Sequence, residues 1–146
     1  MLRVAYALTA VAIIATAAIA QTDFLAERKA LMKKTGENAA ALNKMVKGEA
    51  AFDAAAVTMA FTQWSDLTTK LPTLFPEPPK PGQESRALPK IWETKSDFDA
   101  KIVAFTKAVN DNKGKGGTLD ELKVAYPAVA KTCGDCHESY RRPQQR

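Results

Sequence analysis

The hydrophobic positions of this chain repeat at steps of three and four residues, which is the spacing of one face of an α-helix. Four segments carry the pattern: residues 22–46, 53–71, 96–109 and 118–142. No segment shows a convincing strand pattern, in which apolar and polar residues alternate strictly. Because amphipathic helices bury their apolar stripes against one another, the pattern predicts an all-α protein.

Residues with helix-capping or helix-ending chemistry stand at the predicted boundaries. In chain order they are Gly48 after the first segment, Asp53 before the second, the capping-box pair Ser96 and Asp99 at the third, and the capping-box pair Thr118 and Glu121 at the fourth. Pro127 lies inside the fourth segment and is expected to bend or locally open that helix.

The connections between the segments differ in length and composition. Six prolines fall between residues 72 and 89, so this stretch is expected to be a long irregular crossover. The other two connections are short, and the last one, Asn112–Gly117, is rich in Gly and Lys. Four helices joined in this way predict an up-down-up-down four-helix bundle with one long Pro-rich connection between its second and third helices.

The N-terminal segment, residues 1–20, has the pattern of a secretory signal peptide. Arg3 is its one cation, an apolar and small-residue run follows, and Ala18-Ile19-Ala20 is an Ala-x-Ala cleavage site. A membrane anchor is the alternative, but the strongly apolar stretch is shorter than the ~20 residues that a span needs. We therefore expect an exported protein of residues 21–146, a single domain in the periplasm that does not associate with the membrane.

Composition and charge narrow the possible partners and sites. The 146 residues include 21 Lys and Arg against 16 Asp and Glu, a net charge of +5 that falls by one when Arg3 is removed. This excess is small and no aromatic-interleaved basic patch accompanies it, so a nucleic-acid partner is not expected. Two cysteines and one histidine are too few for a disulfide framework or a closed structural zinc site.

The two cysteines and the histidine lie together as Cys133-Gly-Asp-Cys136-His137, with both cysteines on the apolar stripe of the fourth segment. Cys-x-x-Cys-His is the attachment signature of c-type haem, because a helix presents both sulfurs on one face, where they can form thioethers to two vinyl groups of one porphyrin. Three alternatives are a thioredoxin-like redox pair, an oxidised structural pair, and half of a metal site shared between two chains. The first lacks the βαβ pattern of thioredoxin-like proteins, and the second closes too short a loop to stabilise the fold.

The same pattern suggests the ligands of the iron. His137 is the only imidazole in the chain and is therefore the predicted proximal ligand, the alternative being a surface histidine. In an up-down bundle the first and last helices are antiparallel, which brings Met32 to the height of His137 and leaves Met45 and Met59 near the far end. Met32 is thus either the distal ligand or ordinary core packing.

Two further side chains have open interpretations. Arg28 lies one helical turn before Met32, where it either pairs with a haem propionate or is a solvated surface residue. Trp92 is interpreted as a core residue that anchors the Pro-rich connection, with a haem contact as the alternative.

Taken together, these motifs resemble the class II c-type cytochromes, the cytochrome c′ family. The resemblance covers the whole mature chain and rests on five runs: Arg28-Lys-Ala-Leu-Met32-Lys, Lys47-Gly-Glu, Leu71-Pro through Phe75-Pro, Pro89-Lys-Ile-Trp92, and Cys-Gly-Asp-Cys-His-Glu-Ser-Tyr-Arg at 133–141. In this family, cytochromes c′ proper usually carry an apolar non-ligand residue at the position that Met32 matches, and their five-coordinate iron binds nitric oxide and carbon monoxide. The low-spin cytochrome c-556 branch has a ligating methionine there, and this sequence is similar to that branch.

The resemblance implies a periplasmic electron carrier, not an enzyme, with one covalent haem c and a low-spin iron ligated by His137 and Met32. Cys133 and Cys136 would form the thioethers. The implied partners are redox proteins that the sequence does not identify, and the chain is either a monomer or a homodimer. Two alternatives stay open: a five-coordinate cytochrome c′ that binds nitric oxide or carbon monoxide, and a non-haem thiol or metal-binding helical protein.

Overall fold

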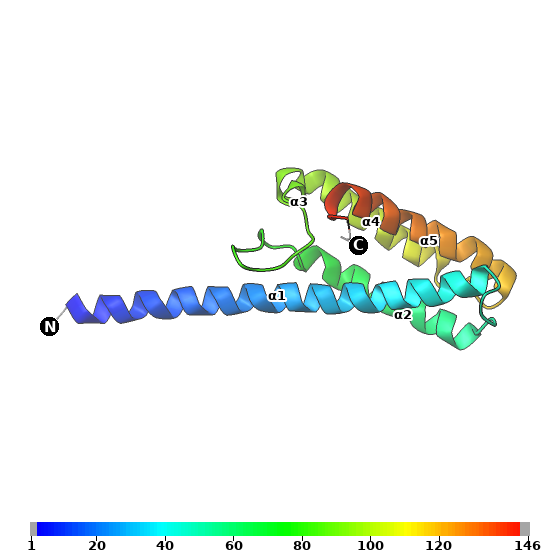
Figure 1. Ribbon diagram of the computed structural model, residues 1–146, viewed down its shortest axis with the longest axis horizontal. Helices are drawn as coiled ribbons and strands as arrows, with labels where there is room; N and C mark the ends of the chain where they lie inside the picture. Colours follow the sequence, from blue (N-terminus) through cyan, green and yellow to red (C-terminus); the bar gives the residue numbers. More distant parts are fainter. Residues whose placement is uncertain (1–2, 144–146) are drawn as a thin grey trace.

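The computed structural model describes the backbone of residues 3–143 and the side chains of residues 24–143 (Figure 1). The elements, in chain order, are α1 (Arg3–Val46), α2 (Ala54–Lys70), the 3-10 helix η1 (Leu71–Thr73), α3 (Lys90–Glu93), α4 (Lys95–Asn112) and α5 (Leu119–Tyr140). The only β pairing among the described residues is one isolated antiparallel bridge between Ala87 and Arg141. The predicted all-α fold class is therefore confirmed.

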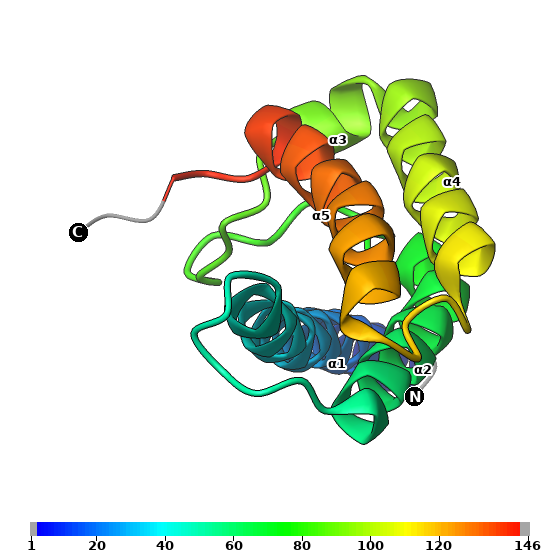
Figure 2. The same cartoon turned by 90° about the vertical axis from the view of Figure 1, so that its right-hand side faces the viewer.

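The four long helices form a closed ring. Helix α1 packs against α2 and α5, and α4 packs against both α2 and α5. Figure 2, which looks along the bundle, shows these four helices around one shared interior. The order corresponds to the predicted up-down-up-down bundle, with the Pro-rich connection crossing from the end of η1 to α3.

Helix α1 is longer than the predicted 22–46 segment because it begins at Arg3. Its N-terminal part, blue in Figure 1, projects beyond the rest of the molecule. The predicted signal peptide, residues 1–20, has no described side chains in the structure. Its cleavage therefore stays a prediction. Within the described residues, no helix combines the length and the apolar character that crossing a bilayer requires.

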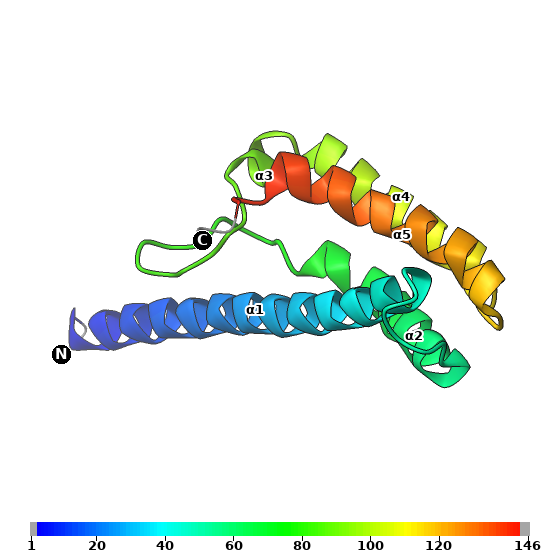
Figure 3. The ribbon, with the colours of Figure 1, turned by 45° about the vertical axis from the view of Figure 1, so that its right-hand side comes forward.

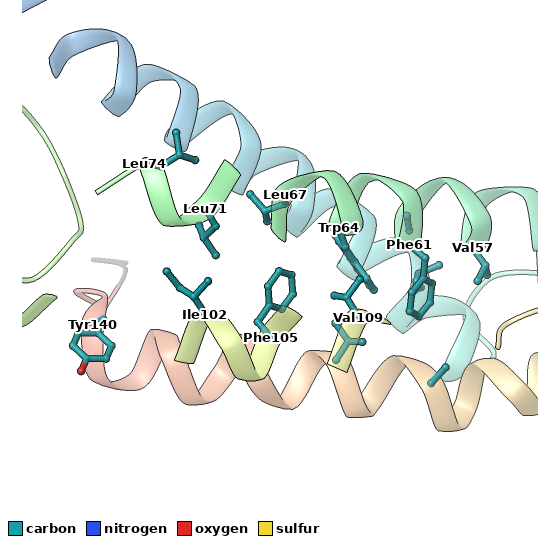
Figure 4. Close-up of a cluster of buried hydrophobic side chains, with 14 of the residues drawn as sticks. Val57, Phe61, Trp64, Leu67, Leu71, Leu74, Ile102, Phe105, Val109 and Tyr140 are labelled. Atoms are coloured by element: carbon teal, nitrogen blue, oxygen red, sulfur yellow. The ribbon is translucent and has the colours of Figure 1, made fainter. Parts of the chain in front are cut away.

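The predicted apolar stripes meet in one core (Figure 4). The stripe of α2 faces the stripe of α4, and α5 completes the layer. Buried side chains from these three helices are Val57, Ala60, Phe61, Trp64 and Leu67 on α2, Phe98, Ile102, Phe105 and Val109 on α4, and Leu122, Ala125, Val129 and Tyr140 on α5. Burying a large apolar side chain contributes about 1.5–3 kcal/mol, so this shared layer is the main stabilising feature of the bundle.

Two of the predicted caps are present in the structure. The Asp53 carboxylate accepts hydrogen bonds from the amides of Ala55 and Ala56 at the start of α2, at 2.9 and 3.1 Å. Thr118 and Glu121 form the complete capping box of α5. Gly48, which follows α1, has a φ of 75°, a left-handed conformation that glycine adopts without steric cost.

The predicted capping box of Ser96 and Asp99 is wrong. Helix α4 begins at Lys95, with Thr94 as its N-cap, so Ser96 already lies in the first turn. The reason is the preceding short helix α3, which leads the chain to a break at Thr94. The Thr94 hydroxyl makes no capping bond and instead lies 2.9 Å from the Tyr140 hydroxyl on α5. The same hydroxyl donates to the Lys90 carbonyl at 2.9 Å, so it serves the end of α3 and the contact with α5 and does not cap α4.

The fourth predicted helix ends slightly early and is not interrupted. Helix α5 runs unbroken through Pro127, so this proline does not open it, and the helix ends at Tyr140 rather than at the predicted Arg142. Arg141 has extended backbone angles and pairs with Ala87 of the Pro-rich connection. That pairing removes Arg141 from the helix.

Gly116, in the turn between α4 and α5, offers a test of the packing at this end of the bundle. A Cβ added there would lie 2.6 Å from Cγ1 of Val57, a buried and stiff side chain on α2. We expect Gly116→Ala to lower the free energy of unfolding by about 1–3 kcal/mol. Urea unfolding monitored by circular dichroism measures this change.

The matched control is Gly36→Ala on the exposed side of α1, where an added Cβ meets nothing within 4 Å. That substitution should raise the free energy of unfolding by about 0.5–1 kcal/mol, because alanine is the better helix former. Equal changes at the two glycines would contradict the packing at Gly116.

Candidate cofactor site

A cavity of about 500 Å³ lies at the end of the bundle that also holds the Pro-rich connection. Figure 3 shows that α1 and α5 diverge toward this end. The cavity is lined by apolar side chains, by cations and by four other residues. The apolar side chains are Leu25, Met32, Leu71, Phe75, Ala87, Ile91, Phe98 and Ile102. The cations are Arg28, Lys29, Lys33, Arg86 and Arg141, and the remaining lining residues are Ser85, Cys136, His137 and Tyr140. No carboxylate is among these lining residues.

The cysteine pair and the histidine lie in the last two turns of α5, and two of the three reach this cavity. Cys136 and His137 line it, whereas Cys133 does not. Cys133 lies one turn earlier, packs against the core, and directs its thiol to the Val129 carbonyl at 3.6 Å. Both thiols are free and half-buried, and their burial raises the pKa of each. A raised pKa disfavours the thiolate, which is the opposite of what a thioredoxin-like redox pair requires.

His137 is held as a neutral imidazole. Burial, together with the positive charges of Arg141 and Arg86, lowers its pKa to about 4. At neutral pH the ring is therefore uncharged and retains a lone pair for a metal ion. Within the described residues, the ring makes no hydrogen bond.

The methionines separate clearly by position. Met32, half-buried on α1, lines the same cavity as His137. Met45 is 7% exposed in the core of the bundle, and Met59 is 65% exposed on the surface of α2. Of the methionines that the structure describes, Met32 alone lines the cavity.

Arg28 is buried, so its interpretation as a solvated surface residue is wrong. Its side chain is 8% exposed, donates to the Leu74 carbonyl at 2.9 Å and to the Ser85 hydroxyl at 3.1 Å, and lies 4.4 Å from the centre of the Phe75 ring. Burial lowers its pKa. No carboxylate of the described structure forms an ion pair with it, so its charge is available to an anionic group in the cavity.

The Pro-rich connection supplies part of the site, which was not predicted from the sequence. Ser85, Arg86 and Ala87 line the cavity, and hydrogen bonds tie this segment to the C-terminal residues. The Leu88 amide donates to the Tyr140 carbonyl, and the Arg86 guanidinium donates to the Arg142 carbonyl. An irregular segment carries no periodic pattern, so composition alone could not assign these three residues to the site.

Trp92 does not line this cavity. It is half-buried against the core, and its indole nitrogen donates to the Phe75 carbonyl at 3.2 Å. Because Phe75 belongs to the start of the Pro-rich connection, this bond confirms the interpretation of Trp92 as an anchor for that segment.

The residues present fit a haem. Apolar walls suit a flat macrocycle, the cations suit its two propionates, and a free Cys-x-x-Cys pair with a neutral histidine suits covalent attachment and iron ligation. A site made only of protein ligands for a metal ion is less suitable. In the part of the chain that the structure describes, no group of three or more His, Cys, Asp or Glu side chains comes together to hold one.

Comparisons with known proteins point in the same direction. The family described as Cytochrome C′ matches residues 23–141. Cytochrome c-556 of Rhodopseudomonas palustris is 38% identical over 145 residues, which cover 97% of each chain. Cytochrome c′ of the same bacterium is 40% identical over 124 residues, 85% of each chain.

Solved structures are similar to the same extent. Cytochrome c′ from Rhodopseudomonas palustris superimposes with a TM-score of 0.77 at 36% identity, covering 84% of this chain and 98% of its own. A structure of oxidised cytochrome c556 from that organism gives a TM-score of 0.75 at 38% identity, with coverages of 85% and 99%. The chain thus belongs to the cytochrome c′ family of class II c-type cytochromes, four-helix bundles that carry one covalent haem c.

Proposed function

We propose that this protein is a periplasmic electron carrier whose single haem iron is ligated by His137 and Met32. The observation that carries the proposal is that a methionine on α1 and a neutral histidine on α5 line one cavity. A haem bound there supplies one-electron chemistry at its iron. The protein would exchange electrons with other redox proteins rather than transform a substrate.

In this proposal the end of α5 holds the group covalently. Cys133 and Cys136 lie three residues apart on one helical face and supply the two thioether sulfurs. His137, the next residue, supplies the proximal nitrogen. Its low pKa means that no proton competes for that nitrogen at neutral pH.

Met32 occupies the opposite side of the site. A thioether is a soft ligand that favours the lower oxidation state of iron and raises the reduction potential. It also fills the sixth position, so small exogenous ligands do not bind readily. Both properties suit a carrier of single electrons.

Arg28 anchors the acidic edge of the group. Its buried guanidinium has no carboxylate partner among the described residues and lines the cavity one turn from Met32. A propionate there would form a charge-assisted hydrogen bond with it. The same guanidinium donates hydrogen bonds to the Leu74 carbonyl and the Ser85 hydroxyl, so it would link the haem propionate to the Pro-rich connection.

A second candidate is a five-coordinate cytochrome c′ that binds nitric oxide or carbon monoxide, with Met32 as packing only. The observation that favours it is the 40% identity to a cytochrome c′, close to the 38% identity to a cytochrome c-556. The two candidates differ only in what Met32 does.

Substitution of Met32 separates the candidates. Met32→Leu removes the sulfur and keeps the volume, so the oxidised protein should lose its near-infrared methionine-to-iron charge-transfer band and become high-spin. The reduced protein should then bind carbon monoxide at once. Met45→Leu, on the same helix but in the core outside the cavity, should keep the wild-type spectrum. Optical spectra of the purified holoproteins measure all three properties.

A wild-type spectrum that is already high-spin and changes at once with carbon monoxide would favour the second candidate. A protein that retains no haem after denaturation would contradict both.

Arg28→Met tests the anchor. Loss of the bonds to Leu74 and Ser85 should lower the free energy of unfolding by about 1–3 kcal/mol. The reduction potential should also fall, because a buried positive charge stabilises the reduced iron. Lys29→Met, an exposed neighbour that lines the same cavity, should change stability by less than about 0.5 kcal/mol. If Arg28→Met and Lys29→Met shift the reduction potential equally, the result contradicts a propionate contact. Arg28 then only anchors the Pro-rich connection.

Export gives a further prediction. Cleavage after Ala20 should leave a mature chain that begins at Gln21, which intact-mass and N-terminal sequencing of the periplasmic fraction would detect. The projection of the N-terminal part of α1 beyond the other helices supports this proposal (Figure 1). Recovery of a chain that starts at Met1 in the membrane fraction would contradict it.

A further inference from the structure

The position of Met32 relative to His137 needs support from elsewhere in the fold. Both side chains line the cavity, so direct packing between them does not fix their separation. Helix α1 packs against α5 and also against α2. Contacts with α2 and with the segment that follows it therefore contribute to holding α1 in place at the height of Met32.

A buried polar network joins α1 to α2 close to Met32. Gln63 of α2 is 9% exposed, and its amide oxygen accepts from the Thr35 hydroxyl at 3.3 Å and from the Asn38 amide at 3.2 Å. Its amide nitrogen donates to the Thr35 hydroxyl at 3.1 Å. Both lone pairs of the Gln63 oxygen are therefore used by side chains of α1.

This network and the bonds of Arg28 lie on either side of Met32. Thr35 follows Met32 by three residues and Arg28 precedes it by four, which correspond to about 4.5 and 6 Å along the helix axis. Arg28 is bonded to the Leu74 carbonyl just after η1 and to Ser85. The turn of α1 that carries Met32 is thus attached at both ends to α2 or to the residues that follow it.

The chemistry of the attachment matters, because a hydrogen bond is directional and weakens steeply when its partners shift, so these bonds favour one height of α1 against α2. We propose that Gln63 is a positioning residue for Met32, whose bonds to Thr35 and Asn38 fix where on the cavity wall Met32 would be offered to a haem iron. This inference rests on the proposed role of Met32. The new element is that Gln63, which does not line the cavity, controls the fraction of protein in which Met32 is bound to the iron.

The test compares Gln63→Leu with Thr68→Val in the holoprotein. Leucine keeps the size of Gln63 but bonds to neither Thr35 nor Asn38. Thr68 is also 9% exposed on α2, but its hydroxyl donates only within its own helix, to the Ser65 carbonyl at 2.7 Å. We expect Gln63→Leu to weaken the methionine-to-iron band and to speed carbon monoxide binding to the reduced protein by about tenfold, the effect of losing one or two buried bonds. Thr68→Val should change neither.

Two additional variants make the result decisive. Thr35→Val breaks the same network from α1 and should reproduce the spectral change, even if Gln63→Leu folds poorly. In a Met32→Leu background, Gln63→Leu should no longer alter carbon monoxide binding, because the residue acts through the methionine.

The inference is overturned if Gln63→Leu and Thr35→Val keep the wild-type band, if Thr68→Val weakens the band as much, or if the effect persists without Met32. A wild-type protein without the methionine band overturns the proposed function as well, so the two failures are distinguishable.

Discussion

The structure depends on keeping one half of a helix bundle open while the other half packs completely. Close packing is the ordinary state of a protein interior, and four amphipathic helices left to themselves would collapse onto one another. Here the apolar layer of α2, α4 and α5 is dense near the turn between α4 and α5, where even Gly116 has no room for a Cβ beside Val57. At the other end α1 and α5 diverge around a cavity of about 500 Å³.

Polar contacts help to hold that open end, together with the edge-to-face rings of Phe75, Phe98 and Tyr140. Arg28 bonds to the Leu74 carbonyl and Ser85, Trp92 bonds to the Phe75 carbonyl, and Arg86 bonds to the Arg142 carbonyl. Each bond satisfies a main-chain or hydroxyl group of a segment that has no helix or sheet of its own. These side chains therefore shape the cavity wall, and their cations suit acidic groups in the interior. Burial, with the charges of Arg141 and Arg86, keeps the pKa of His137 low.

Helix caps could be predicted from the sequence where only neighbouring residues form the capping bonds. Asp53 and Thr118 cap their helices through bonds to residues two or three positions away, and both were found from the sequence. Ser96 had the same local pattern but failed, because α3 and the contact of Thr94 with Tyr140 moved the start of α4. The Pro-rich connection was correctly expected to be irregular, yet no periodic pattern could reveal that Ser85 to Ala87 line the cavity.

The sequence by itself determined the fold class, the order of the helices and the Cys-x-x-Cys-His motif, because helical periodicity and the spacing of Cys133, Cys136 and His137 are properties of one segment. Only the tertiary structure decided that Arg28 is buried, that Met45 belongs to the core, and that Met32 lines the same cavity as His137. The bonds of Arg28 join residues 46 and 57 positions apart, and Met32 and His137 are about a hundred positions apart in the chain. These facts depend on how α1 is held against α2, and a pattern within one helix contains no information about that height.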